Sequence, residues 1–190
     1  HAANFYGATP MAEAAIQADA EMLRVLLDAG AEVDERNADG MTPLMAVVRT
    51  ANLDAARLLI EHGANVNAIE QWKGQTALMW ASAQRQPAMV RLLLEHGADP
   101  NVQSNLNNHE RHITAEPRYL WRPPGGLTAL HYAARQGCVD CARALVEGGA
   151  EIDRGDPEGA TALLVASMNF NFDTAAYLVE AGANVNKWDW

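Results

Sequence analysis

The chain has 190 residues, 49% of them apolar, and a formal net charge of −10. This charge disfavours binding to nucleic acid and to anionic lipid, because no run of Lys or Arg creates a local basic patch. No apolar stretch approaches the roughly 20 residues that a membrane-spanning helix needs. We therefore expect a soluble protein without membrane insertion, cytoplasmic or exported, whose compartment depends on sequence before the first residue.

Two sets of markers divide the chain into units of nearly constant length. Gly-Ala pairs recur with spacings of 33, 34, 52 and 33 residues, and threonines that precede apolar runs recur with the same spacings. A fixed period of this length indicates a repeat array. Each threonine stands 21 residues before the glycine of its unit, so only the connections between units differ in length. The markers are Thr9 with Gly30, Thr42 with Gly63, Thr76 with Gly97, Thr128 with Gly149 and Thr161 with Gly182.

The first repeat, at about residues 4–36, shows the pattern that the others share. Apolar residues at helical spacing follow Thr9, and a second such set follows them, which predicts two short helices. The Thr9 hydroxyl can cap the first helix, Pro10 suits its first turn, and Gly30 can end the second helix in a left-handed conformation. Residues 1–3 look like the tail of a preceding repeat, so we expect the array to be truncated at this end.

The remaining repeats follow the same plan, with two deviations in their connections. The connection before Thr76 is one residue longer than its counterparts, and the connection before Thr128 carries an insertion at residues 104–124. Pro87 falls at the start of a second helix, where proline is tolerated. Lys187 begins the pattern of a further unit, which indicates truncation at this end as well. These repeats span about residues 37–69, 70–103, 125–155 and 156–188.

The repeated segments resemble the ankyrin repeat family. The resemblance rests on Gly-Leu-Thr-Ala-Leu-His-Tyr-Ala-Ala at residues 126–134 and on Leu-Leu-x-x-Gly-Ala-x-x-Asn at 93–101, with similar closures at 58–67 and 178–186. It implies an all-α fold, an ankyrin-repeat α-solenoid of stacked helix-turn-helix units with short β-turn or hairpin connections. Residues 73–81 resemble bacterial arrays in particular.

One departure from the family pattern concerns a histidine. The histidine that follows Thr-Pro-Leu in the family, and usually forms a hydrogen bond to the next repeat, occurs here only as His131. We therefore expect this link at one step of the array, and apolar stacking alone at the others. The residues at the equivalent positions are Ala12, Met45, Met79 and Leu164.

Stacking of the helix pairs predicts a groove. Small residues recur on the first helix of each repeat, so first helices can lie closer together than the Leu-rich second helices, and their side of the array should be concave. Turns and first helices then form one groove, whose side chains differ from repeat to repeat. Because variable side chains on a fixed scaffold discriminate between partners, we expect the partner-binding residues here: Tyr6, Met41, Arg49, Trp72, Lys73, Gln75, Arg135 and Met168.

The insertion is a second candidate for binding. Loops longer than about 12 to 15 residues are uncommon unless they bind something or are disordered. Its second half holds Arg118, Tyr119 and Trp121, residue types that dominate interface energetics, together with prolines that limit disorder. These side chains could bind an acidic partner. Alternatively, Tyr119 and Trp121 pack the loop onto its own solenoid.

The two cysteines allow a third kind of site. Cys138 and Cys141 stand at helical spacing and could form a redox pair, or a metal site together with His109 and His112 of the insertion. Alternatively, Cys141 fills a core position and Cys138 lies at the turn between helices. Such closely spaced cysteines are not the framework of a small secreted domain, so we expect that disulfides do not hold the fold together. We expect no metal and no other cofactor.

The residue types at the repeat positions bear on catalysis. An enzyme needs a nucleophile, a base and an orienting group in one pocket, whereas these positions supply mostly Ala, Leu, Met and Gly. We therefore expect no enzyme and no small-molecule substrate, but an interaction module that binds a protein partner through the groove and residues 104–126. The alternative is a structural spacer or shielding segment of a larger bacterial protein.

Overall fold

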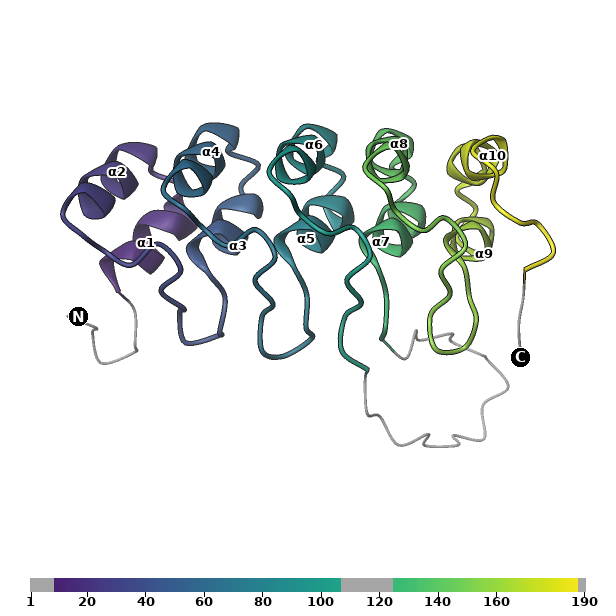
Figure 1. Ribbon diagram of the computed structural model, residues 1–190, viewed down its shortest axis with the longest axis horizontal. Coiled ribbons are helices and arrows are strands. Elements are labelled where there is room, and N and C mark those ends of the chain that lie inside the picture. Colours follow the sequence, from purple (N-terminus) through teal and green to yellow (C-terminus); the bar gives the residue numbers. More distant parts are fainter. Residues whose placement is uncertain (1–8, 107–124, 188–190) are drawn as a thin grey trace.

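The computed structural model describes residues 9–106 and 125–187. Within these ranges the chain forms helix-turn-helix pairs stacked side by side, with the first helices of the pairs in one row and the second helices in another (Figure 1). The expected all-α solenoid is thereby confirmed. The first helices are α1 (Pro10–Gln17), α3 (Pro43–Val48), α5 (Ala77–Ala83), α7 (Ala129–Gln136) and α9 (Ala162–Met168). The second helices are α2 (Ala20–Asp28), α4 (Leu53–Glu61), α6 (Pro87–Glu95), α8 (Val139–Glu147) and α10 (Phe172–Glu180).

The helices begin and end where the side chains supply the missing hydrogen bonds. The hydroxyl oxygen of Thr9 accepts a hydrogen bond from the amide of Ala12 at 3.2 Å, and Thr42, Thr76 and Thr161 cap their helices in the same way. Pro10 and Pro87 occupy first helical turns, where their lack of an N–H costs nothing. Gly30 follows α2 with a φ of +86°, the left-handed conformation expected of it.

The connections between pairs are hairpin loops that project from the row of first helices (Figure 1). In each loop a polar side chain satisfies the backbone amides of the turn: Asn37 accepts from Asp39 and Met41, and Asp156 accepts from Glu158 and Ala160. In the interrupted loop, the Ser104 hydroxyl accepts from the amide of Leu127. The stems of the insertion pair as an antiparallel bridge between Leu106 and Gly125. The insertion therefore extends one hairpin without breaking the stack.

Asparagines in the closing pattern bind each pair to the next. The Asn67 side chain donates to the carbonyl of Gly97 and accepts from the amide of Asp99, at 2.9 and 2.8 Å. Asn101 makes the same two hydrogen bonds to Gly149 and Glu151, across the insertion. First helices also pack against each other more closely than second helices do, as their small side chains predict.

His131 supplies a buried link between α7 and the next loop. Its Nε2 lies 2.9 Å from the carbonyl oxygen of Ala160, and its Nδ1 accepts from the amide of Thr128 at 3.2 Å. Because a carbonyl can only accept, Nε2 carries the proton and the ring is neutral. Burial lowers the pKa of His131, and the hydrogen bond to Ala160 opposes this effect only in part. The single histidine link expected between repeats is present.

Candidate functional site

The loop between α4 and α5 is built around a buried carboxylate. Glu70 accepts hydrogen bonds from the amides of Trp72, Lys73 and Gln75, at 2.7, 2.6 and 3.1 Å. This turn is one residue longer than those at Asn37 and Asp156, and the longer, two-oxygen side chain of glutamate spans it. The turn thus holds three of the expected partner-binding residues in a fixed backbone conformation.

Two aromatic side chains on neighbouring first helices each contact the guanidinium group of an arginine. On α7 the Arg135 guanidinium lies 5.0 Å from the ring centroid of Tyr132, and Arg49, after α3, lies 5.7 Å from that of Trp80 on α5. Both distances are within the range of cation–π attraction. The Gln75 amide donates to the Tyr132 hydroxyl at 2.7 Å, which ties the loop to α7. Arginine and aromatic side chains therefore gather at the α5–α7 junction.

A cavity of about 140 Å³ opens at this junction, where the loops meet the first helix. Its wall depends on a close approach between neighbouring loops. The Asn105 amide donates to the carbonyl of Lys73 at 2.7 Å, and a Cβ at Gly74 would lie 2.5 Å from the Asn105 side chain. Gly74 also has a φ of +63°, so glycine is required here on both counts. The lining residues are Lys73, Gln75, Ser104, Asn105, Gly125, Leu127, Tyr132 and Arg135.

The cavity has two cationic side chains and no carboxylate in its lining. Within residues 9–106 and 125–187, neither Lys73 nor Arg135 forms an ion pair. The nearby Glu70 carboxylate is already occupied by three backbone amides. In a chain with 24 acidic and 14 basic residues, two cations without an ion-pair partner among the described residues are unexpected, and they give the lining of this cavity a charge opposite to that of the whole molecule.

The expected partner-binding residues fall into three groups. Lys73, Gln75 and Arg135 meet at the cavity, whereas Arg49 contacts Trp80 of α5 from the end of α3 and does not line the cavity. Trp72 is 79% exposed at the tip of its loop, and Met168 is 45% exposed on α9. Tyr6, Arg118, Tyr119 and Trp121 lie outside the described residues.

Met41, expected among the partner-binding residues, is buried instead. Its side chain is only 9% exposed and belongs to the apolar core. Its amide donates to the Asn37 side chain and its carbonyl accepts from the Asn37 amide, which draws this end of the turn inward. A partner in the groove therefore has little of Met41 to contact.

Two residues of the site, Trp80 and Tyr132, were missed by the sequence reasoning. Each stands four residues after its capping threonine, at a position occupied elsewhere by Glu13, Ala46 and Val165. Aromatic residues at this position in two adjacent repeats were the signal available. No binding role was predicted for this position from the sequence, whereas the structure places the Tyr132 hydroxyl against the Gln75 amide in the cavity lining.

A larger cavity, of about 410 Å³, lies on the outward face of α9 and α10. It is lined mainly by apolar side chains, including Leu163, Leu164 and Val179. Leu163 and Leu164 correspond to Leu130 and His131 of α7, which are buried against the following pair. This cavity therefore lies on a stacking face of the array, and we do not count it as part of the groove.

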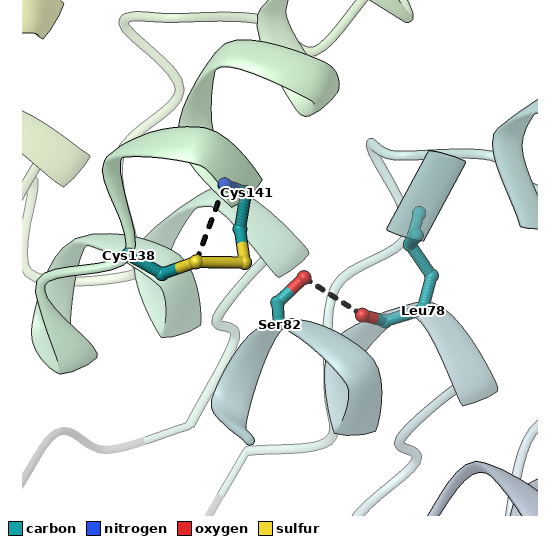
Figure 2. Close-up of a disulfide and its surroundings, with 4 residues drawn as sticks. All are labelled: Leu78, Ser82, Cys138 and Cys141. Carbon is teal, nitrogen blue, oxygen red and sulfur yellow. Dashed lines mark hydrogen bonds between the residues drawn. A yellow bond between two sulfur atoms is a disulfide. The ribbon is translucent and has the colours of Figure 1, made fainter. Parts of the chain in front are cut away.

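The two cysteines are bonded to each other (Figure 2). Cys141 is fully buried and Cys138 caps the start of α8, the positions expected for a core residue and a turn residue. The Cys138 sulfur also accepts from the Cys141 amide at 3.2 Å, and the pair faces Ser82 of α5 (Figure 2). The chain therefore contains a disulfide. This bridge links residues three apart within one repeat and does not join two repeats.

Neither a metal centre nor a membrane span emerges from the part of the chain that the structure describes. No group of three or more His, Cys, Asp or Glu side chains is arranged to hold a metal ion there. His109 and His112, the other half of the possible metal site, lie outside it. None of the helices in residues 9–106 and 125–187 has the length and apolar character needed to cross a bilayer.

Comparison with known proteins matches the chain to a family model described as "Ankyrin repeats (3 copies)", over residues 11–104 and 106–189. The chain is 34% identical over 125 residues to the B-cell lymphoma 3 protein homolog of Mus musculus, covering 66% of this chain and 24% of that protein. It is 30% identical over 166 residues to the probable E3 ubiquitin-protein ligase XBOS33 of Oryza sativa subsp. japonica, covering 76% and 32%. The Gallus gallus nuclear factor NF-kappa-B p105 subunit is 31% identical over 141 residues, covering 73% and 12%.

The lengths and the organisms of these relatives limit what the comparison implies for this chain. The chain spans about a third of their length or less. They come from animals and a plant, so they give no support to the bacterial character expected from residues 73–81.

Proposed function

The chain belongs to the ankyrin repeat family, and we propose that it is a protein-binding module without catalytic activity of its own, which contacts its partner through the groove at the α5–α7 junction. One observation carries the proposal. Lys73 and Gln75 come from one loop and Arg135 from a helix beyond the insertion, yet they line one cavity. A rigid carboxylate-centred turn and a stacked tyrosine hold them in place before any partner arrives, which lowers the ordering cost of binding.

The activities in the relatives' names are not part of this proposal. Ubiquitin ligation and the NF-kappa-B designation belong to proteins of which this chain spans 32% and 12%. What the family membership supports is the coarser function, protein–protein interaction. The groove, its anchor residues and the insertion are our assignment.

Affinity capture from an extract of the cells that produce the protein tests the groove. The groove variant carries Trp72→Ala, Gln75→Ala and Arg135→Ala. The control variant carries Arg57→Ala, Arg91→Ala and Arg143→Ala, which remove exposed side chains from second helices. Because interface anchors contribute more than about 1 kcal/mol each, the groove variant should capture at least tenfold less partner, and the control variant should capture as much as the wild type.

Circular dichroism of all three proteins shows whether they remain folded. Partner loss in the control variant, with full capture by the groove variant, would place the binding surface on the second helices and refute the assignment.

The insertion is tested in the same assay. Leu106 and Gly125 face each other across an antiparallel bridge, so residues 107–124 can be replaced by the tight turn Asn-Gly without moving the stems. We propose that the insertion extends the binding surface, and shortening it should weaken capture. Unchanged capture would confine the interface to the groove.

A further inference from the structure

The size of the α5–α7 cavity limits what it can hold. Sites for drug-sized molecules and cofactors have volumes of about 300 to 1,000 Å³, and this cavity has about 140 Å³. A space of this size accommodates the end of one side chain with little room to spare. The cavity is therefore of the right size for a single side chain of a partner.

Hydrogen-bond donors converge on the cavity. The Tyr132 hydroxyl accepts from Gln75, so its own proton remains available to a further acceptor. The Arg135 guanidinium stacks on the same ring, and its N–H groups form no hydrogen bond within the described ranges. The Lys73 ammonium adds a second charged donor. Three donors, two of them cationic, fit an acceptor that carries a negative charge.

Two carboxylates of the described residues accept hydrogen bonds from their own turns. Glu70 is saturated by backbone amides, and one Asp156 oxygen accepts from two amides of its own turn. Arg154 and Glu151 form an ion pair with each other, and neither residue lines the cavity. Within residues 9–106 and 125–187, no carboxylate forms an ion pair with Lys73 or Arg135.

We propose that this cavity receives the side-chain carboxylate of a Glu or Asp in an acidic segment of the partner protein. The proposal rests on the proposed groove function and specifies the chemistry of its partner. Arg135 donates to the carboxylate in the plane of its guanidinium, Lys73 neutralises it from the loop, and Tyr132 donates its hydroxyl proton. The net charge of −10 of the whole chain repels acidic segments elsewhere on its surface, which adds selectivity.

Three capped pentapeptides test the assignment without the natural partner. Each has glycines around one central residue, which is glutamate, glutamine or phosphoserine. ¹⁵N NMR titration of the full chain follows the Gln75 side-chain amide and the Arg135 Nε–H. The glutamate peptide should shift both signals saturably and the glutamine peptide should shift neither, since charged hydrogen bonds exceed neutral ones in strength.

Variants assign the effect to the cavity. Arg135→Gln and Lys73→Gln should each weaken binding of the glutamate peptide about tenfold, as the loss of one charged hydrogen bond implies. Arg143→Gln is the matched control, because this arginine also stacks on a tyrosine, Tyr177, at 4.6 Å, but on the second-helix row. It should leave binding unchanged.

Equal shifts with the glutamate and glutamine peptides, or equal weakening by Arg143→Gln, would overturn the carboxylate assignment. Binding of the phosphoserine peptide tenfold tighter than the glutamate peptide would overturn it in favour of a phosphorylated segment. Either result leaves the groove proposal standing if the groove variant still loses its partner. If instead the glutamate peptide binds as expected and the groove variant keeps its partner, the groove proposal fails and the anion site remains.

Discussion

Two neighbouring junctions of the array are closed in different ways. At the α7–α9 junction, His131 donates to the carbonyl of Ala160 across a fully buried hydrogen bond. At the α5–α7 junction the equivalent residue is Met79, which is buried but apolar, and the polar link lies at the groove surface between Gln75 and Tyr132. The α7–α9 junction is thus stabilised by a buried hydrogen bond. At the α5–α7 junction the buried contact is apolar, and the hydrogen bond lies where solvent can reach it.

The two kinds of hydrogen bond suit different roles, one in stability and the other in binding. A buried hydrogen bond contributes through the penalty of leaving its partners unsatisfied, whereas polar groups at the surface can exchange their partners for water or for a ligand. We therefore expect the α7–α9 junction to be the stronger one against unfolding and the α5–α7 junction to be available for binding. Substitutions at the two junctions should have effects of different size.

The largest effect is expected from His131→Ala. The substitution leaves the buried Thr128 amide without its partner, removes one of the two hydrogen bonds to the Ala160 carbonyl and opens a cavity, which together cost about 3 kcal/mol. Urea denaturation followed by circular dichroism measures the loss in the free energy of unfolding. A loss below about 1 kcal/mol would mean that water enters the junction and replaces the ring, and the contrast drawn above would not hold.

Acidification is expected to have a smaller effect on the free energy of unfolding than His131→Ala. Burial lowers the pKa of His131 below its value in the unfolded chain, about 6.5. Below that pH the unfolded state takes up a proton that the folded state does not, so the free energy of unfolding is constant above about pH 7 and falls as the pH drops through 6.5. Between pH 7.5 and 5.5 the loss from this one group has an upper limit of about 1.4 kcal/mol, which the unfolded-state pKa alone sets.

His131→Gln isolates that contribution, because glutamine does not titrate. His62 and His96 are exposed and remain in both proteins. The difference in free energy of unfolding between wild type and variant should shrink on acidification over this range, by at most about 1.4 kcal/mol. A difference that stays constant would show that another group governs the acid sensitivity.

Much of the fold could be predicted because its signals are local and repeated. The constant distance from each capping threonine to its glycine fixes the length of every helix pair, and caps such as Thr9 and Gly30 act within a few residues of themselves. The histidine link was predictable for a similar reason, since the motif that contains His131 occurs once. The insertion between Leu106 and Gly125 left the constant distance unchanged and so was predicted to extend a loop.

The site was less predictable, because it depends on contacts between units. Register placed Lys73, Gln75 and Arg135 in the groove, yet their meeting at one cavity depends on how the neighbouring loop approaches Gly74. Tyr132 stands at a position held by Glu13, Ala46, Trp80 and Val165 in the other repeats, so no shared pattern pointed to its hydrogen bond with Gln75. The spacing of Cys138 and Cys141 allowed a bridge, a metal site or two separate thiols, and only the geometry of the helix start decides between them.

The smallest effect on stability is expected from Gln75→Ala. Its hydrogen bond to Tyr132 is partly exposed, so water can replace the amide, and the free energy of unfolding should fall by less than about 1 kcal/mol. The same urea titration as for His131→Ala measures it, which makes the two junctions directly comparable. Gln75→Ala should weaken binding of the glutamate peptide more than His131→Ala does. Without Gln75 the Tyr132 hydroxyl can rotate away from the cavity, and the peptide loses a preorganised donor. If Gln75→Ala destabilised the chain as much as His131→Ala, the surface link would be a structural tie, and the groove at this junction would be formed at the expense of stability.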